Sequence, residues 1–258
     1  MHVSEKYKPV PSSEEIIDYI RETKPGLVGF SVMSQQYDWV VQQSKAIRQA
    51  MPNLIQTIGG VHCTMVPDEV HKSKLFDYVC VGEGDWALLE LMDALENGEQ
   101  PHTLSNFRSW MGSVPVSNPV APFPDLEKLP PLDYDIFDMK AVMKETRGWM
   151  GILTSRGCPY KCTYCFNIEI VDQYIEDGAA KNVKDFLRHF PVEVMMEDLK
   201  KLVRENPEIN TFIFDDDLFT LNTNYVVKFC EAYKKHKVNV PFVVNGHVNC
   251  FDKVAAKA

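Results

Sequence analysis

Short apolar runs alternate with amphipathic stretches along the first 100 residues, and this alternation constrains the fold more than any other feature. A capping-box pair, Ser12 and Glu15, opens the first helix pattern. Further along lie apolar runs at 27–32, 54–58 and 78–81 and helix patterns at 38–50 and 86–95. Such alternation is typical of a doubly wound parallel sheet with helices on both faces. Met1–Pro11 is too polar to provide the strand that usually opens such a domain, so we expect residues 1–100 to form an α/β domain without its first strand.

The alternation stops at a proline-rich segment and then starts again. Residues 101–147 contain seven prolines, a density that disfavours regular interior elements, so a connector is expected there. Residues 148–258 then show apolar runs at 150–154, 211–214 and 240–244 and helix patterns at 192–204 and 225–236. Strands that alternate with helices in this way predict the start of a parallel barrel. Val240–Val244 would then be an unpaired edge strand.

Three cysteines follow the first of these later strands. Cys158, Cys162 and Cys165 have C-x3-C-x2-C spacing, within the segment Thr154–Asn167. Three thiolates can hold a cubane iron–sulfur cluster and leave one of its four irons open to another ligand. A structural zinc site is the alternative, but it usually takes four ligands in paired knuckles, and no second knuckle follows. The run therefore indicates a redox site, with zinc binding and chance as the other interpretations.

The net charge, the length of the apolar runs and the number of cysteines restrict the binding partners and the cellular compartment of the protein. The formal net charge is −9, which disfavours nucleic-acid binding. No apolar run approaches the length of a membrane span. An odd number of cysteines, seven in all, argues against a disulfide framework and for a reducing cytoplasm.

The segment Thr154–Asn167, with an aromatic residue before its third cysteine, resembles the radical S-adenosylmethionine (SAM) enzymes that carry an N-terminal cobalamin-binding domain. The resemblance extends from about Ser13 to the end of the chain. It implies a Rossmann-like, cobalamin-binding doubly wound sheet followed by a partial (β/α) radical SAM barrel, truncated at both ends. It also implies a [4Fe-4S] cluster on the three cysteines, with Tyr164 and Phe166 bordering the adenine of SAM.

A second set of residues resembles the cobalamin-binding elements of that family. Ser31 and Met33 match its serine-x-leucine element, and a Gly-Gly element follows 25 residues later. By this resemblance the Ser31 hydroxyl bonds the nucleotide tail of cobalamin, and glycines leave room for the tail. The family's histidine motif, D-x-H-x-x-G, is absent, and a cobalamin contact from His62 is a weaker alternative. The cobalamin set is Ser31, Met33, Gly59, Gly60, Gly82, Glu83 and Gly84.

Asp215, Asp216 and Asp217 follow the strand pattern at 211–214. Three adjacent acids repel one another unless a positive group lies nearby. In the family, an acidic segment at this place contacts the ammonium group of SAM. A magnesium site and a solvated acidic loop are alternatives. If the strand continues, Asp215 and Asp217 share one side and Asp216 faces the other.

These patterns lead to three functional hypotheses. The first is a cobalamin-dependent radical SAM enzyme, or a fragment of one, that cleaves SAM reductively to drive methyl transfer or oxidative cyclisation. The second is a radical SAM enzyme without cobalamin, and the third is a non-catalytic zinc or iron–sulfur protein. The resemblance implies a small-molecule substrate and a reductant such as flavodoxin or ferredoxin.

Overall fold

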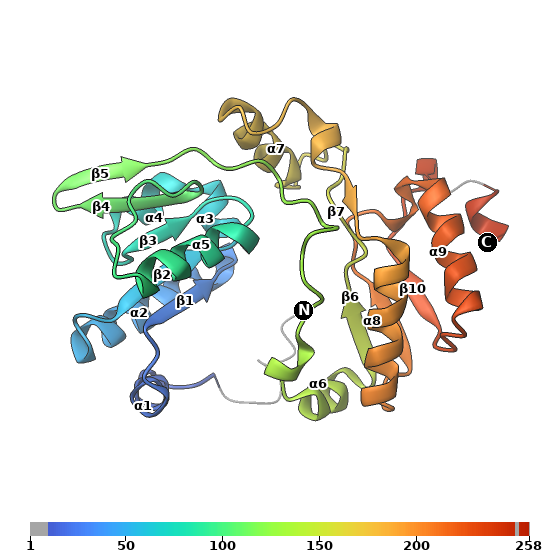
Figure 1. Ribbon diagram of the computed structural model, residues 1–258, viewed down its shortest axis with the longest axis horizontal. Coiled ribbons are helices and arrows are strands. Elements are labelled where there is room, and N and C mark those ends of the chain that lie inside the picture. The colour runs from blue at the N-terminus through green and yellow to red at the C-terminus, as the bar shows by residue number, and fades with distance from the viewer. Residues whose placement is uncertain (1–9, 251–252, 258) are drawn as a thin grey trace. The chain divides into compact units, whose positions relative to one another are not determined.

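The computed structural model describes residues 10–250 and 253–257, so the expectation for Met1–Pro11 lies almost wholly outside the described residues. The described chain forms two compact units (Figure 1). The N-terminal unit comprises Val10–Pro124 and Lys161–Asn182, and the C-terminal unit comprises Asp125–Tyr160 and Val183–Ala258. The division differs from the expected boundaries at 100 and 147, because residues 101–124 and 161–182 pack with the first sheet.

The N-terminal unit contains a five-stranded sheet in the order β1-β2-β3-β4-β5. Strands β1, β2 and β3 are parallel, and β4 and β5 continue the sheet as an antiparallel hairpin. The elements of this unit are α1 (Ser13–Thr23), β1 (Leu27–Ser31), α2 (Tyr37–Ala50), β2 (Ile55–Gly59), α3 (Val61–Met65), α4 (Pro67–Lys72), β3 (Tyr78–Cys80), α5 (Asp85–Glu96), β4 (Phe107–Met111), β5 (Val114–Ser117) and α7 (Asn167–Glu176).

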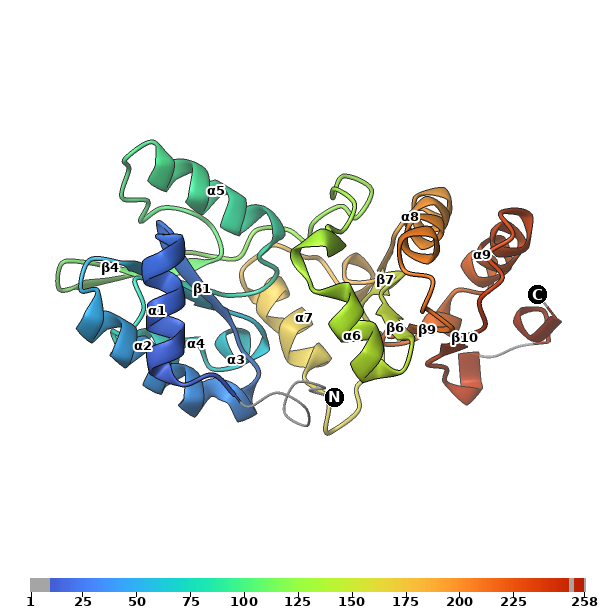
Figure 2. The same cartoon turned by 90° about the horizontal axis from the view of Figure 1, so that it is seen from below.

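Helices cover both faces of this sheet. On one face, Phe30, Ile58 and Val79 pack in a core with residues of α2, α3 and α4. On the other, Tyr78 and Cys80 pack against α5, and Figure 2 shows α5 opposite α2 and α4. Burial on both faces explains why the parallel strands are continuous apolar runs. The predicted doubly wound α/β fold is therefore confirmed, and the Ser12–Glu15 capping box is present.

The proline-rich connector contains more regular structure than expected. The β4–β5 hairpin and α6 (Met139–Thr146) lie within residues 101–147. Pro115 is tolerated because β5 is the edge strand of the sheet, where a missing N–H need not break a ladder. The hairpin turns at Gly112, whose φ is +62°. The prediction of a connector without regular elements is therefore wrong.

The C-terminal unit contains a three-stranded parallel sheet in the order β10-β9-β6. Helices α8 and α9 pack on one face, and Figure 2 shows both on the same side of the strands. The partial barrel pattern of strand, helix and parallel strand is thus present. The elements are β6 (Trp149–Ile152), β7 (Ser155–Arg156), β8 (Arg188–His189), α8 (Val192–Glu205), β9 (Thr211–Phe214), α9 (Thr223–Lys235) and β10 (Phe242–Val244).

No helix among the described residues is long and apolar enough to span a membrane.

Candidate functional site

A cavity of about 520 Å³ opens where β1, β2 and β3 end. Carboxyl ends of parallel strands are the usual ligand-binding edge of open α/β sheets. Five of the seven residues in the predicted cobalamin set line this cavity: Ser31, Gly59, Gly60, Gly82 and Gly84. Apolar neighbours such as Ile58, Leu88 and Phe107 complete the lining. The cavity is therefore a largely apolar recess with exposed backbone, which suits a large organic ligand.

Backbone geometry explains why glycine occupies the rim of the cavity. Gly60 has a φ of +93°, and a Cβ there would lie 2.6 Å from the Val32 nitrogen. A side chain at this position would be strained and would collide with the backbone of Val32, just after β1. Gly59 is less restricted, because its Cβ would meet the Cβ of Cys80 at 3.2 Å. Burial raises the pKa of the Cys80 thiol to about 12, so this wall of the cavity stays uncharged.

Three residues near the cavity do not line it. Met33 is 44% exposed, and neither it nor Glu83 belongs to the lining. The His62 ring lies 4.2 Å from the Tyr37 ring, and its Nδ1 is 3.1 Å from the Ser34 hydroxyl. Burial lowers the pKa of His62. His62 therefore packs against α2 and is absent from the cavity wall.

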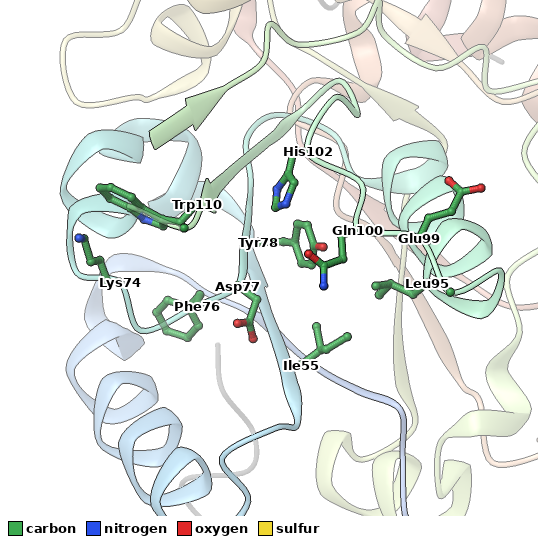
Figure 3. Close-up of a pocket in the computed structure, with 12 residues that line it drawn as sticks. Ile55, Lys74, Phe76, Asp77, Tyr78, Leu95, Glu99, Gln100, His102 and Trp110 are labelled. Carbon is green, nitrogen blue, oxygen red and sulfur yellow. The ribbon is translucent and has the colours of Figure 1, made fainter. Parts of the chain in front are cut away.

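A second cavity, of about 570 Å³, lies at the opposite, amino-terminal end of β2 and β3 (Figure 3). Lys74 places its ammonium 4.1 Å from the centre of the Trp110 ring on one side. Asp77, near the middle, is bonded to Arg48 at 2.6 Å. None of the residues singled out by the sequence lines this cavity, so the smaller cavity is the candidate site.

The cysteine loop leaves β6 and runs through a compact turn. The N–H of Cys165 donates to the carbonyl of Cys162 at 2.9 Å, and all three cysteines are partly exposed and outside any disulfide. Tyr164 is 91% exposed and Phe166 is 37% exposed. No three His, Cys, Asp or Glu side chains among the described residues are gathered as a metal site. The donor chemistry nevertheless fits an iron–sulfur cluster, since three accessible thiols are its usual protein ligands.

The three aspartates after β9 continue the alternation of the strand. Phe212, Phe214 and Asp216 are wholly buried on the helix side of the sheet, whereas Asp215 and Asp217 are exposed. A Cβ on Gly151 of β6 would lie 2.7 Å from Asp215 Oδ2, so Asp215 lies over the face opposite α8 and α9. Burial, followed by the neighbouring Asp216 charge, raises the pKa of Asp215.

Asp216 is bonded to the start of the cysteine loop. Its Oδ1 accepts from the N–H of Thr154 at 3.1 Å, from the Thr154 hydroxyl at 2.9 Å and from the Ser155 hydroxyl. Its Oδ2 has no hydrogen-bond partner among the described residues. The Tyr225 hydroxyl donates to the carbonyls of Thr154 and Phe190. Asp216 is thus an internal anchor for the loop, a role that adjacent acids in a sequence do not reveal.

The comparisons agree with this geometry. Residues 4–92 match the B12 binding domain family. The chain is 26% identical over 247 residues to an uncharacterized methyltransferase of Pyrococcus horikoshii, covering 95% of this chain and 51% of that protein. It is 26% identical over 227 residues to the anaerobic magnesium-protoporphyrin IX monomethyl ester cyclase of Cereibacter sphaeroides, covering 85% of this chain and 35% of the cyclase.

Two solved structures share the fold. The radical SAM methyltransferase TsrM from Kitasatospora setae superposes with a TM-score of 0.73 at 17% identity, over 95% of this chain and 48% of TsrM. The cobalamin-dependent radical SAM enzyme OxsB superposes with a TM-score of 0.72 at 20% identity, over 90% of this chain and 32% of OxsB. The chain therefore contains a match to the B12 binding domain over residues 4–92 and shares its fold with OxsB and TsrM. It spans about half the length of the Pyrococcus relative.

Proposed function

We propose that this chain is the cofactor-binding part of a cobalamin-dependent radical SAM enzyme that catalyses methyl transfer or oxidative cyclisation on a small molecule. The observation that carries the proposal is the cavity at the ends of β1–β3, because it gathers most of the predicted cobalamin residues. OxsB, which shares the fold, was solved with aqua-cobalamin and SAM bound. The methyltransferases and the cyclase among the relatives support these two reaction types.

Different residues of the N-terminal unit would contact different parts of cobalamin. Gly59, Gly60, Gly82 and Gly84 give the ligand access to the backbone. Ser31, on the exposed end of β1, presents its hydroxyl to the tail. Apolar side chains on the α5 side exclude water from the recess.

The cysteine loop would hold a [4Fe-4S] cluster through the thiolates of Cys158, Cys162 and Cys165. When bound, the cluster and SAM supply one-electron and radical chemistry, while the protein binds and orients them. The exposed rings of Tyr164 and Phe166 are available to border an adenine. Asp215 and Asp217 are exposed, and Asp215 lies over the face of β9 opposite α8 and α9, so they are the carboxylates proposed to bind the ammonium of SAM.

A flavodoxin-type or ferredoxin-type reductant in a reducing cytoplasm would supply the electron. We also propose Asp216 as a residue that positions the loop, since it is fully buried and bonded to Thr154 and Ser155.

Metal and cofactor analysis after anaerobic purification tests the proposal. We expect about four irons per chain, no stoichiometric zinc, and saturable binding of hydroxocobalamin. Cys162→Ala should lose the brown absorbance and the reductive cleavage of SAM, whereas Cys230→Ala, outside the loop, should keep both. Zinc in place of iron would contradict the radical assignment. A cluster without hydroxocobalamin binding would favour the radical SAM enzyme that does not use cobalamin.

A further inference from the structure

Helix α7 begins two residues after Cys165, yet it packs with the N-terminal sheet. It contacts α3, and its Tyr174 is wholly buried in a small core with Val81, Val120 and Ala180. Cys162 and Cys165 belong to the same unit as α7, the sheet and the cavity. Part of the cysteine loop is therefore physically attached to the cobalamin-binding unit.

Tyr174 makes the closest of these contacts. The N–H of Glu83 donates to its hydroxyl at 2.7 Å. Its ring stacks on Phe123 with 3.8 Å between ring centres and 9° between planes. One turn beyond, Asp177 Oδ2 accepts from the N–H of Val120 at 2.9 Å. Both the hydroxyl and the ring of Tyr174 are thus fixed by the sheet unit.

The contact requires glycine at position 82. Gly82 has a φ of +81°, and a Cβ there would lie 2.4 Å from the Tyr174 hydroxyl. Its own N–H donates to the Thr64 hydroxyl at 3.0 Å. Gly82 and Gly84 also line the 520 Å³ cavity. The loop Gly82–Gly84 therefore borders the cavity and also contacts Tyr174.

We propose that Tyr174 is a positioning residue that couples occupancy of the cobalamin cavity to the conformation of the Cys162–Cys165 turn. A ligand packed against Gly82–Gly84 fixes the Glu83 amide that bonds Tyr174, and α7 carries this constraint to Cys165. The inference rests on the proposed function, since it takes a corrinoid as the ligand of the cavity. Coupling of this kind is reciprocal, so a cluster on the cysteines also strengthens cobalamin binding.

Hydroxocobalamin titrations of cluster-loaded and cluster-free protein, followed by absorbance, measure this coupling directly. In the unchanged protein, loading the cluster should tighten binding by about fivefold or more. Tyr174→Phe keeps the ring and removes the hydroxyl, so this ratio should fall to about one. The cluster-free affinity of the variant should change by less than about twofold, because Tyr174 does not line the cavity.

Amide hydrogen exchange gives a readout that does not depend on activity. In cluster-free protein, hydroxocobalamin should slow exchange over residues 161–167, and Tyr174→Phe should abolish this slowing. Tyr233→Phe is the matched control, since its hydroxyl also makes a hydrogen bond to the backbone, donating to the Val240 carbonyl at 2.6 Å, in the other unit. The control should keep both the ratio and the slowing.

Failure of the coupling and failure of the proposed function give different results. A titration ratio that is the same in Tyr174→Phe as in the unchanged protein, or a ratio of one in both, overturns the coupling. Absence of hydroxocobalamin binding to the unchanged protein overturns the proposed function instead. If Tyr174→Phe does not fold, Phe123→Leu removes the stacked ring and leaves the hydroxyl bond, and it should reduce the ratio in part.

Discussion

Two strand ends in this molecule carry small or acidic residues, and they are built in opposite ways. At the end of β2, Gly59 and Gly60 leave the backbone open and border a cavity of about 520 Å³. After the end of β9, Asp216 is buried in the core. It accepts hydrogen bonds from the hydroxyls of Thr154 and Ser155, which follow β6 at the start of the cysteine loop. The same edge of a parallel sheet thus serves as an open receptor in one unit and as a closed support in the other.

The difference separates residues that border an open cavity from residues that hold other residues in place. Gly60 at the open end is required by its backbone, because its φ is positive and a Cβ there would lie 2.6 Å from the Val32 nitrogen. A buried carboxylate at a closed end is required by its hydrogen bonds, because its donors would otherwise be left unpaired. Four substitutions test this contrast.

The largest effect is expected at the closed end. Asp216→Ala removes the acceptor of three buried donors and should lower the free energy of unfolding by about 3 kcal/mol or more. Asp216→Asn keeps one acceptor oxygen and should cost less than Asp216→Ala, about 1–3 kcal/mol, because its amide N–H donors replace Oδ2 at a buried position without a partner. Urea unfolding of both variants measures this. Equal stability of Asp216→Ala and the unchanged protein would contradict the role of Asp216 as an anchor of the cysteine loop.

At the open end, Gly60→Ala should destabilise the protein by about 1–3 kcal/mol because of its positive φ. It should also weaken hydroxocobalamin binding by about tenfold or more, since the turn must move. Gly29→Ala is the matched control: it lines the same cavity, but its Cβ would meet its nearest neighbour at an ordinary 3.5 Å. If the two variants have the same affinity for hydroxocobalamin and the same stability, the cavity does not depend on the turn at Gly60.

Tyr225→Phe should cost about 1 kcal/mol, because the Phe190 carbonyl loses the hydroxyl donor at 3.1 Å. The same change should speed amide exchange at residues 154–157, where the closed end holds the loop. Tyr233→Phe should leave exchange there unaltered, since its hydroxyl bonds Val240. Equal exchange at 154–157 in the two variants would exclude Tyr225 from the support of the loop.

The smallest effect concerns Asp215, whose pKa is raised by partial burial and then by Asp216. A carboxyl whose folded pKa lies above its unfolded value favours folding below the unfolded pKa, and this contribution is lost as pH rises through the folded pKa. Asp215→Asn should therefore stabilise the protein by a few tenths of a kcal/mol at pH 7, because the side chain is largely solvated. The gain should vanish below about pH 4. A pH series of urea unfolding curves checks the sign, and a loss of stability at pH 7 would contradict it.

Local patterns were enough to predict the parallel strands and their covering helices. The capping box at Ser12 and the apolar runs of β1, β2 and β9 depend on neighbours in sequence, and these elements formed as expected. The exposure of both Asp215 and Asp217 beside the buried Asp216 also agrees with strand alternation, although alternation did not say which side would be buried. These features are fixed by periodicity, which a single sequence displays.

Long-range packing decided what the sequence did not show. The 2-residue strands β7 and β8 and the hairpin β4–β5 depend on partners far along the chain. Nothing near Tyr174 indicates that α7 packs on Gly82, which lies more than 90 residues earlier. The Asp216 anchor likewise joins residues about 60 positions apart. Such contacts are set by tertiary packing and leave no local pattern.

The discontinuous N-terminal unit has a consequence for how the chain is made. During synthesis, β1–β5 are made well before Tyr174. The apolar patch around Val81, Val120 and Phe123 therefore remains exposed until α7 has been synthesised. The first half of a newly made chain therefore cannot reach its final packing by itself. We expect nascent chains that stop near residue 124 to bind chaperones or aggregate. Chains that extend beyond residue 182 should do so less.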